Sequence, residues 1–243
     1  MVRLSVFLSL LLVFFLSCAS GVEKNQAAGR TPSHLISEKE WKLQFPGGTK
    51  MAEQKLLGGY ASRYYSLSCD EDGTEWIHFA LDGADSGHSK NTRYVRSELR
   101  HVENWNLLNR RSMSYTFRAN ASQAQSSYTV GQIHILPDDS VIPGETSPLL
   151  RLEIVKNQFR AKIKDYADGH YETIILCGYK DGSEKRVAVE TVGENLSVFV
   201  DGEKKFTRRV FCPFKNYFKV GIYPQQTHGL FDVFVKDLVV EIE

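Results

Sequence analysis

Short segments in which apolar and polar residues alternate recur through the second half of this chain, and turn signals separate them. The stretch from Arg186 to Phe211 alone holds three such segments. Successive side chains of a strand point to opposite faces, so this period marks strands with one buried face. Turn pairs typical of hairpins stand at Lys156-Asn157, Asp181-Gly182, Gly193-Glu194 and Asp201-Gly202. Many short strands without long helices between them predict an all-β sandwich or jelly roll.

The first 20 residues have the pattern of a secretory signal peptide. Arg3 precedes a run from Leu4 to Leu16 that is apolar apart from two serines, and small residues follow. We expect a secreted, extracellular protein, with a loose leader at 21–36 and a single domain at 37–243. Lipid anchoring at Cys18 is the alternative. No later segment reaches the roughly 18 apolar residues of a membrane span, so no stable membrane insertion is expected.

Composition narrows the possible partners and the cysteine chemistry. The 30 basic and 29 acidic residues give a formal net charge of +1, which predicts no nucleic-acid partner, and we expect a monomer. Loss of the signal peptide leaves three cysteines, hence at most one internal disulfide, for which Cys177 with Cys212 is the preferred pair. Cys–His metal spacing is absent from the sequence.

Three segments present ionisable groups on one strand face and aliphatic groups on the other. In 96–100, Arg96, Glu98 and Arg100 share a face; in 132–135, Gln132 and His134 do so; in 217–225, the face holds Tyr217, Lys219, Gly221, Tyr223 and Gln225. A single charged face is usually a solvated surface. Arg, Gln, His and Tyr together suit binding and proton transfer better than solvation, so we expect the three faces to form one groove.

This set of groups suits cleavage of an acidic sugar polymer by β-elimination. An arginine fork matches a carboxylate, and neutralising that carboxylate stabilises the intermediate formed when the proton at C5 leaves. Histidine and tyrosine can exchange the protons, and Lys219 would lower the pKa of Tyr223. Glu98 is expected to be held ionised by Arg96 and Arg100. No metal or other cofactor is required.

The blocks RSELR (96–100), QIH (132–134) and YFKVGIYPQ (217–225) resemble, in order and spacing, the three signature blocks of alginate lyases of polysaccharide lyase family seven. EWKLQFP (40–46) resembles that family's opening strand. The resemblance implies a β-jelly roll, a concanavalin-like antiparallel sandwich with a concave substrate groove. It also implies a substrate, alginate, that is usually cleaved from within the chain.

The resemblance also implies residue roles. Arg96 and Gln132 would neutralise the carboxylate, His134 would be the base or assist it, and Tyr223 would be the acid, or both acid and base on mannuronate. Gly221 would leave room for the sugar. Ile133, between Gln and His, accompanies activity on guluronate-containing blocks in this family. Pro224 departs from the family pattern and predicts a bulge or an edge position. The positions implied to bind the substrate or to brace the groove are Glu98, Arg100, Lys219 and Gln225.

Three alternatives remain open at this point. A non-catalytic jelly roll that binds acidic polysaccharides would need the arginine and the glutamine but not His134 with Tyr223. A lyase for another polyuronate, such as glucuronan, would share the carboxylate chemistry. A glycoside hydrolase would need paired carboxylates, for which DEDGTE (70–75) is the only candidate, and its composition is that of an exposed turn.

Overall fold

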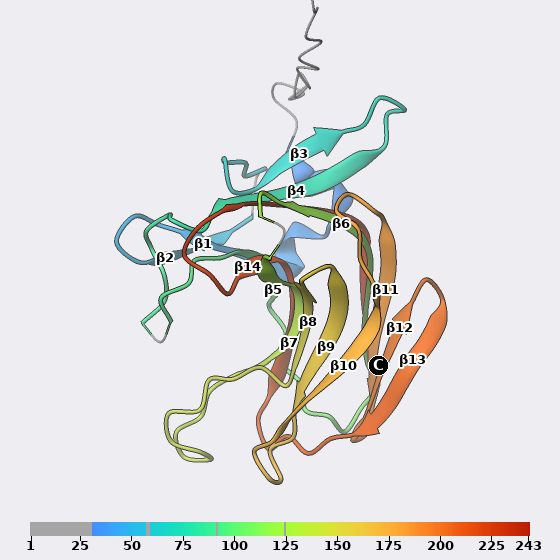
Figure 1. Cartoon of the computed structure of the whole chain (residues 1–243). Helices are drawn as coiled ribbons and strands as arrows, with labels where there is room; N and C mark the ends of the chain where they lie inside the picture. The colour runs from blue at the N-terminus through green and yellow to red at the C-terminus, as the bar shows by residue number, and fades with distance from the viewer. Residues whose placement is uncertain (1–30, 57–58, 91, 124) are drawn as a thin grey trace, which may run out of the picture.

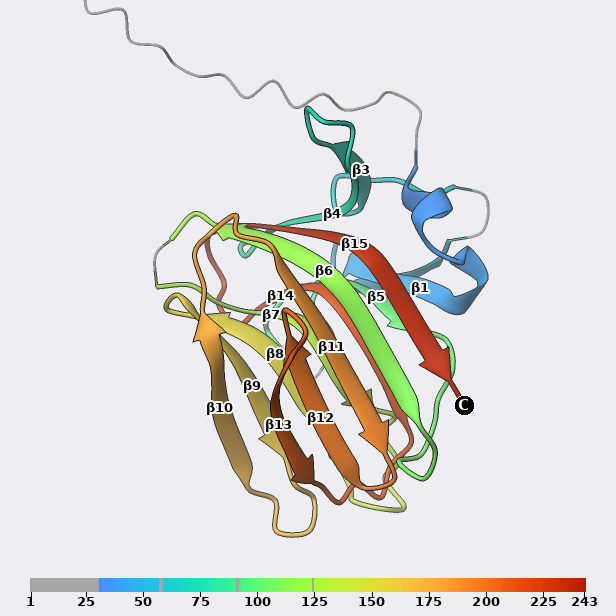
Figure 2. The same cartoon turned by 90° about the vertical axis from the view of Figure 1, so that its right-hand side faces the viewer.

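The computed structural model describes residues 31–56, 59–90, 92–123 and 125–243, so the predicted signal peptide lies outside the described residues. In this described part the strands form two antiparallel sheets that pack face to face (Figures 1 and 2). The eight-stranded sheet has the order β10 (Tyr171–Gly178), β9 (Gln158–Lys164), β8 (Leu150–Val155), β7 (Ser127–Ile135), β14 (Asn216–Pro224), β5 (Ser97–His101), β1 (Trp41–Pro46) and β2 (Met51–Lys55). The seven-stranded sheet has the order β13 (Glu203–Arg209), β12 (Asn195–Val200), β11 (Lys185–Val192), β6 (Arg111–Ala121), β15 (Leu230–Ile242), β4 (Glu75–Asp82) and β3 (Ser66–Cys69).

The core lies between the two sheets, where the inward residues of each strand meet. Leu99, Ile133 and Val220 are all 0 % exposed and belong to one cluster with Phe79 and Phe117 of the opposite sheet. Burial of each such side chain contributes about 1.5–3 kcal/mol. The period-two prediction for the three polar segments is therefore confirmed on its apolar side.

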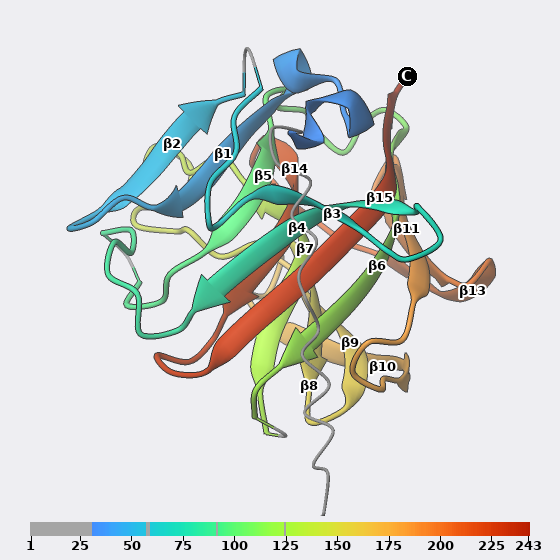
Figure 3. The same cartoon turned by 90° about the horizontal axis from the view of Figure 1, so that it is seen from above.

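The chain alternates between sheets at the centre of the sandwich. β4, β6 and β15 belong to one sheet, while β5, β7 and β14, which follow or precede them in sequence, belong to the other. Seen from above, β4, β15 and β6 run side by side over β5, β14 and β7 (Figure 3). This crossing makes β14 the neighbour of both β5 and β7, and so brings three segments far apart in sequence onto adjacent strands.

Most of the predicted hairpins are confirmed. Lys156 and Asn157 join β8 to β9 with φ of 50° and 62°, the left-handed pair of a type I′ turn, and Asp201-Gly202 joins β12 to β13. The hairpin at Asp181-Gly182 is wrong. β10 and β11 flank this turn, but they belong to different sheets, so the turn carries the chain across the sandwich.

The preferred disulfide is also wrong, because Cys69, Cys177 and Cys212 are all free thiols. Cys177 lies opposite Phe159, near the end of β10. Cys212 follows Phe211 in the chain. The carbonyl oxygen of Phe211 accepts a hydrogen bond from the backbone N–H of Tyr166, which lies near the start of β10. Six residues of extended strand separate the two ends, roughly 20 Å, whereas a disulfide needs Cα atoms within about 7 Å.

The expected loose leader is wrong over its described part. Pro32–Leu35 form a short 3₁₀ helix, η1, in which Pro32 is buried, and Leu35 and Ile36 pack against the core. A second such helix, η2 (Glu38–Glu40), leads directly into β1. The folded domain therefore includes these residues. No helix among the described residues is long and apolar enough to cross a membrane.

Candidate active site

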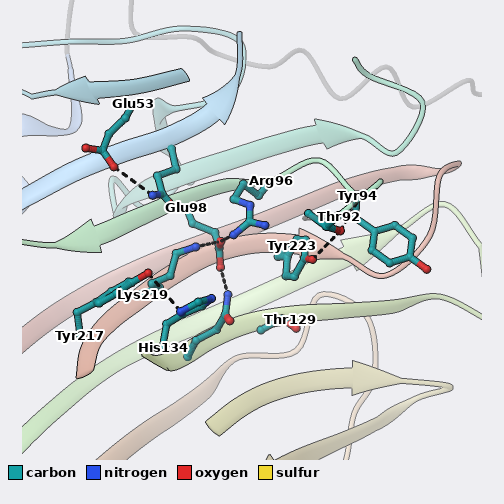
Figure 4. A network of polar contacts seen from close by, with 12 residues as sticks. Glu53, Thr92, Tyr94, Arg96, Glu98, Thr129, His134, Tyr217, Lys219 and Tyr223 are labelled. Carbon is teal, nitrogen blue, oxygen red and sulfur yellow. Dashed lines mark hydrogen bonds and ion pairs between the residues drawn. The ribbon is translucent and has the colours of Figure 1, made fainter. Parts of the chain in front are cut away.

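A groove of about 250 Å³ runs over the outer face of the eight-stranded sheet, and the four predicted catalytic residues all line it. They come from three adjacent strands or the residues that lead into them, because β14 pairs with β5 on one side and with β7 on the other. Figure 4 shows the side chains of Arg96, His134 and Tyr223 close together in this groove. The lining residues are Gln44, Met51, Ser89, Thr92, Arg96, Gln132, His134, Pro137, Thr146, Pro148, Arg151, Tyr217 and Tyr223.

The guanidinium of Arg96 donates no hydrogen bond to any other described residue. Its closest carboxylate is Glu98, at 3.6 Å from Nη1 to Oε2, and its Cζ lies 4.4 Å from the ring centroid of Tyr223. The residue is 9 % exposed, and its buried Nε has no partner. A buried donor without a partner is costly, and a planar fork of free donors matches a carboxylate. Arg96 is therefore placed to bind an anionic group in the groove.

His134 is held as a neutral imidazole with one defined tautomer. Its Nδ1 lies 2.8 Å from the carbonyl oxygen of Ile135, which can only accept, so Nδ1 carries the hydrogen. Burial, reinforced by the charges of Lys219, Arg96 and Arg100, lowers the pKa of His134 from 6.5 to about 3. Nε2 has no hydrogen-bond partner among the described residues, so its lone pair is available as a base on the groove side.

Contacts to its hydroxyl and to its ring hold Tyr223 in place. Its hydroxyl lies 3.2 Å from Oγ1 of Thr92, and Arg96 covers its ring. Thr92 is itself oriented, because its Oγ1 accepts from the backbone N–H of Tyr94. These contacts keep the phenol in the groove opposite His134 (Figure 4). The groove thus combines a phenol, a neutral imidazole and a guanidinium that donates no hydrogen bond to the described residues.

A buried layer of charge lies beneath the groove. Glu98 accepts from Lys219 through Oε2 and from Gln132 through Oε1, and the side chains of Glu98 and Lys219 are each 1 % exposed. The expectation that Glu98 and Lys219 bind substrate is therefore corrected, because both are covered by the residues above them. Of the two arginines expected to pair with Glu98, Arg96 lies 3.6 Å from its Oε2, whereas Arg100 forms no ion pair with it among the described residues; Lys219 is the second partner.

Arg100 and Gln225 lie outside the lining of the groove. Arg100 stacks over the ring of Tyr217 at 4.1 Å and donates to Oδ1 of Asn104 at 2.8 Å. Gln225 turns back on its own strand, where its Nε2 donates to the carbonyl of Tyr223 at 2.6 Å. Both residues therefore contact tyrosines of β14, and neither is among the residues that line the groove.

Gly221 is required by the backbone conformation and by the close approach of β5, and it leaves no space for a sugar. Its φ is +140°, and an added Cβ would lie 2.4 Å from the carbonyl oxygen of Ser97. The register against β7 shifts between Val220 and Tyr223, which is the bulge expected near Pro224. Pro224 itself is tolerated because pairing of β14 with β5 ends at Ile222, so one side of the strand is an edge at this point.

The groove also contains residues that the sequence patterns did not indicate. Thr92 comes from the loop before β5, in which His88 and Arg93 are exposed and do not line the groove. Arg151 comes from β8, whose register places it beside Gln132. Alternation along β8 marked Arg151 as outward-facing, but nothing local to the sequence indicated that β8 lies next to β7.

Among the described residues, no group of three His, Cys, Asp or Glu side chains is arranged to hold a metal ion. The groups that are present can bind a carboxylate, remove a proton and supply one. On one sheet face of a jelly roll, they are the set of groups that a polysaccharide lyase requires.

Comparison with known proteins identifies the family within that class. Residues 36–241 match the family model described as alginate lyase, and the chain belongs to this family. No curated protein matched the sequence in a direct search.

Solved structures of alginate lyases share the fold. Alginate lyase A1-II′, a member of polysaccharide lyase family 7, has a TM-score of 0.74 and 23 % identity over 86 % of this chain and 97 % of its own. Alginate lyase PA1167 from Pseudomonas aeruginosa has a TM-score of 0.71 and 24 % identity over 86 % of this chain and 100 % of its own. The alginate lyase from Klebsiella pneumoniae has a TM-score of 0.69 and 16 % identity over 88 % of this chain and 99 % of its own. The predicted jelly roll is confirmed.

Proposed function

We propose that the groove cleaves the 1,4-linkages of alginate by β-elimination, and that Arg96, Gln132, His134 and Tyr223 carry the reaction. The observation that carries the proposal is the guanidinium of Arg96, which donates no hydrogen bond to the described residues, beside the phenol of Tyr223 and in the same groove as the neutral imidazole of His134. The similar enzyme A1-II′ has been crystallised with a substrate called GGMG and with a product called GGG. An acidic sugar chain in this groove agrees with both observations.

The reaction requires one proton to leave and one to arrive. A base removes the proton at C5, the electrons of that bond form the C4–C5 double bond, and the C4–O4 bond breaks. The departing O4 takes a proton from the acid. Arg96, with the second amide hydrogen of Gln132, neutralises the carboxylate on C5 and so stabilises the charge that develops there. The products are a new reducing end and a 4,5-unsaturated uronate.

His134 and Tyr223 divide the proton transfers. The lone pair on Nε2 of His134 accepts the C5 proton or assists its removal, and the hydroxyl of Tyr223 protonates O4. On mannuronate, where the C5 proton lies on the other face of the sugar, Tyr223 serves as both base and acid. Thr92 keeps the phenol oxygen oriented in either case.

Ultraviolet absorbance of the unsaturated product tests the proposal. We expect absorbance to rise when the wild-type protein acts on alginate and to stay flat with Tyr223→Phe, which removes only the phenolic oxygen. Binding of oligouronates to Tyr223→Phe, measured by calorimetry, should persist. A folded wild-type protein that binds but never produces the chromophore would instead be a non-catalytic polysaccharide-binding jelly roll. Activity on glucuronan and none on alginate would reassign the substrate.

The block preference and the mode of cleavage form a finer part of the proposal. Guluronate-containing blocks are the proposed preference, supported by Ile133 between Gln132 and His134. Ile133 is 0 % exposed and cannot touch a sugar, so any effect on preference must act through the strand that positions its neighbours. Endolytic cleavage is proposed for a groove on an open sheet face. Separate polyguluronate and polymannuronate substrates, with chromatography of early products, test both points.

Secretion is proposed from the pattern of residues 1–20. N-terminal sequencing of protein recovered from the culture medium tests it, and a mature N-terminus near residue 21 is the expected result. Lipid anchoring at Cys18 would instead leave the protein in the membrane fraction.

A further inference from the structure

A row of cross-strand partners runs across the eight-stranded sheet that carries the groove. This row contains most of the lysines and arginines of that sheet. Each residue in this row is the direct cross-strand partner of the next, so all of them stand on the same face. We call it the basic row; in order from β1 to β9 it consists of Lys42, Arg100, Lys219, Gln132, Arg151 and Lys162. Five of its six side chains are cationic.

Most of these cations are already engaged. Lys42 pairs with Glu53 at 3.1 Å, Lys219 is buried against Glu98, and Arg100 is held by Asn104 and Tyr217. These members of the basic row have little charge left for a ligand.

Lys162 is different, because its ammonium has neither an ion pair nor a hydrogen bond among the described residues. Its Nζ lies 4.6 Å from the ring centroid of Tyr171, which is 47 % exposed on the edge strand β10. Its cross-strand neighbour Arg151 has one carboxylate near it, Glu153 at 3.8 Å, and Arg160 binds that same carboxylate at 2.7 Å. Two arginines thus share one carboxylate and Lys162 has none among the described residues, which leaves an excess of positive charge at this end of the row.

The patch is continuous with the groove but remote from the reacting atoms. Arg151 lines the groove, whereas Lys162 lies one strand further out. Neighbouring strands are about 4.8 Å apart, so four strand spacings place Lys162 roughly 19 Å from the strand that follows Arg96. β7, β8, β9 and β10 lie side by side along this path (Figure 1).

We infer that Arg151 and Lys162, with the exposed face of Tyr171, form a second carboxylate-binding subsite for uronate units of the same polymer, several units away from the cleaved bond. This inference rests on the proposed function, because it takes the polyuronate as ligand. A polymer with a carboxylate on every unit meets the cations strand by strand as it crosses the sheet. The subsite selects for chain length and aligns a long substrate across the groove.

Oligouronate length is the variable that tests the subsite. Calorimetry on Tyr223→Phe protein would compare a short oligouronate, which spans only the groove, with one long enough to reach β9, with and without Lys162→Gln. Exposed charge interactions contribute up to about 1 kcal/mol, so we expect Lys162→Gln to weaken long-chain binding by about three- to fivefold and short-chain binding by less. Lys162→Glu should weaken it further, and the loss should shrink in high salt.

Lys204→Gln is the matched control, because Lys204 also lies over an aromatic ring, Phe199, but on the other sheet. It should leave both affinities unchanged. A ratio of long-chain to short-chain affinity that Lys162→Gln and Lys162→Glu leave unchanged overturns the subsite, even if the wild type is an active lyase. A wild type without activity on any polyuronate would overturn the proposed function instead, and the binding ratio would still decide whether the subsite exists.

Discussion

Lys219 donates a hydrogen bond to the carboxylate of Glu98 in an ion pair whose two side chains are each 1 % exposed. The pair lies under the groove, between the strands that carry Arg96 and His134. A charge without its partner in this position would face a large desolvation cost, so the two residues depend on one another.

Breaking this pair from one side should destabilise the fold. We expect Lys219→Met to lower the free energy of unfolding by about 3–5 kcal/mol, since it leaves the Glu98 carboxylate buried with a weaker partner. The double variant Lys219→Met with Glu98→Gln should recover a large part of that loss. Urea unfolding of the two variants measures both values. A single variant within about 0.5 kcal/mol of wild type would contradict this account of the pair.

The hydroxyl of Thr92 should contribute to the rate of the reaction. Thr92→Val keeps the side-chain volume but removes the contact with the Tyr223 hydroxyl and the acceptor for the backbone N–H of Tyr94. A hydrogen bond of about 0.5–1.5 kcal/mol corresponds to a decrease in kcat of roughly two- to twelvefold. Thr146→Val is the matched control, because Thr146 also lines the groove but makes no hydrogen bond to Tyr223. Equal kcat values for both variants would remove Thr92 from the positioning of the acid.

The neutral state of His134 predicts a specific response to pH. Its folded pKa lies near 3 and its ordinary value is 6.5, so between these values the unfolded chain binds a proton that the folded chain does not. The free energy of unfolding should therefore fall as pH decreases from about 6.5, and His134→Gln should lack this component. NMR of the imidazole should show no titration near pH 6.5, and the acid limb of kcat/KM should show no ionisation there. A His134 signal that titrates at its ordinary value would contradict the assignment.

Replacement of Gly221 should damage both stability and activity. Alanine at a φ of +140° costs about 1–3 kcal/mol from backbone strain, and its Cβ would also meet the carbonyl of Ser97. The strand would have to shift, and Tyr223, two residues later, would shift with it. Gly178→Ala is the control, because nothing lies within 4 Å of its added Cβ. Thermal unfolding compares the two, and equal midpoints would show that the bulge does not require glycine.

Local pattern was sufficient to predict which face of each motif strand is buried. Leu99, Ile133 and Val220 face the core as the period-two alternation predicts, and Arg96, Gln132, His134 and Tyr223 meet in one groove. The resemblance to the family's signature blocks supplied the role of each group. Alternation carries this information because it depends only on the strand itself.

The predictions that were wrong depended on how separate strands pair and pack. The turn at Asp181-Gly182 reverses the chain in either a hairpin or a sheet crossing, and its sequence does not distinguish them. The pairing of Glu98 with Lys219 joins residues 121 positions apart, whereas Arg100 is only two residues away from Glu98. Thr92 reaches the groove because of the course of the loop before β5, and Arg151 because β8 lies next to β7. Neither relation is visible in the local sequence.

The basic row also bears on how the sheet finds its correct alignment. A slip of one residue between two strands exchanges the faces of every side chain on the slipped strand. In this sheet such a slip would drive a cation of the row into the interior and expose residues such as Leu99 or Ile133 to water. The charges that follow the polymer across the strands therefore also disfavour one-residue slips during folding, because each such slip would place a cation on the core side of the sheet.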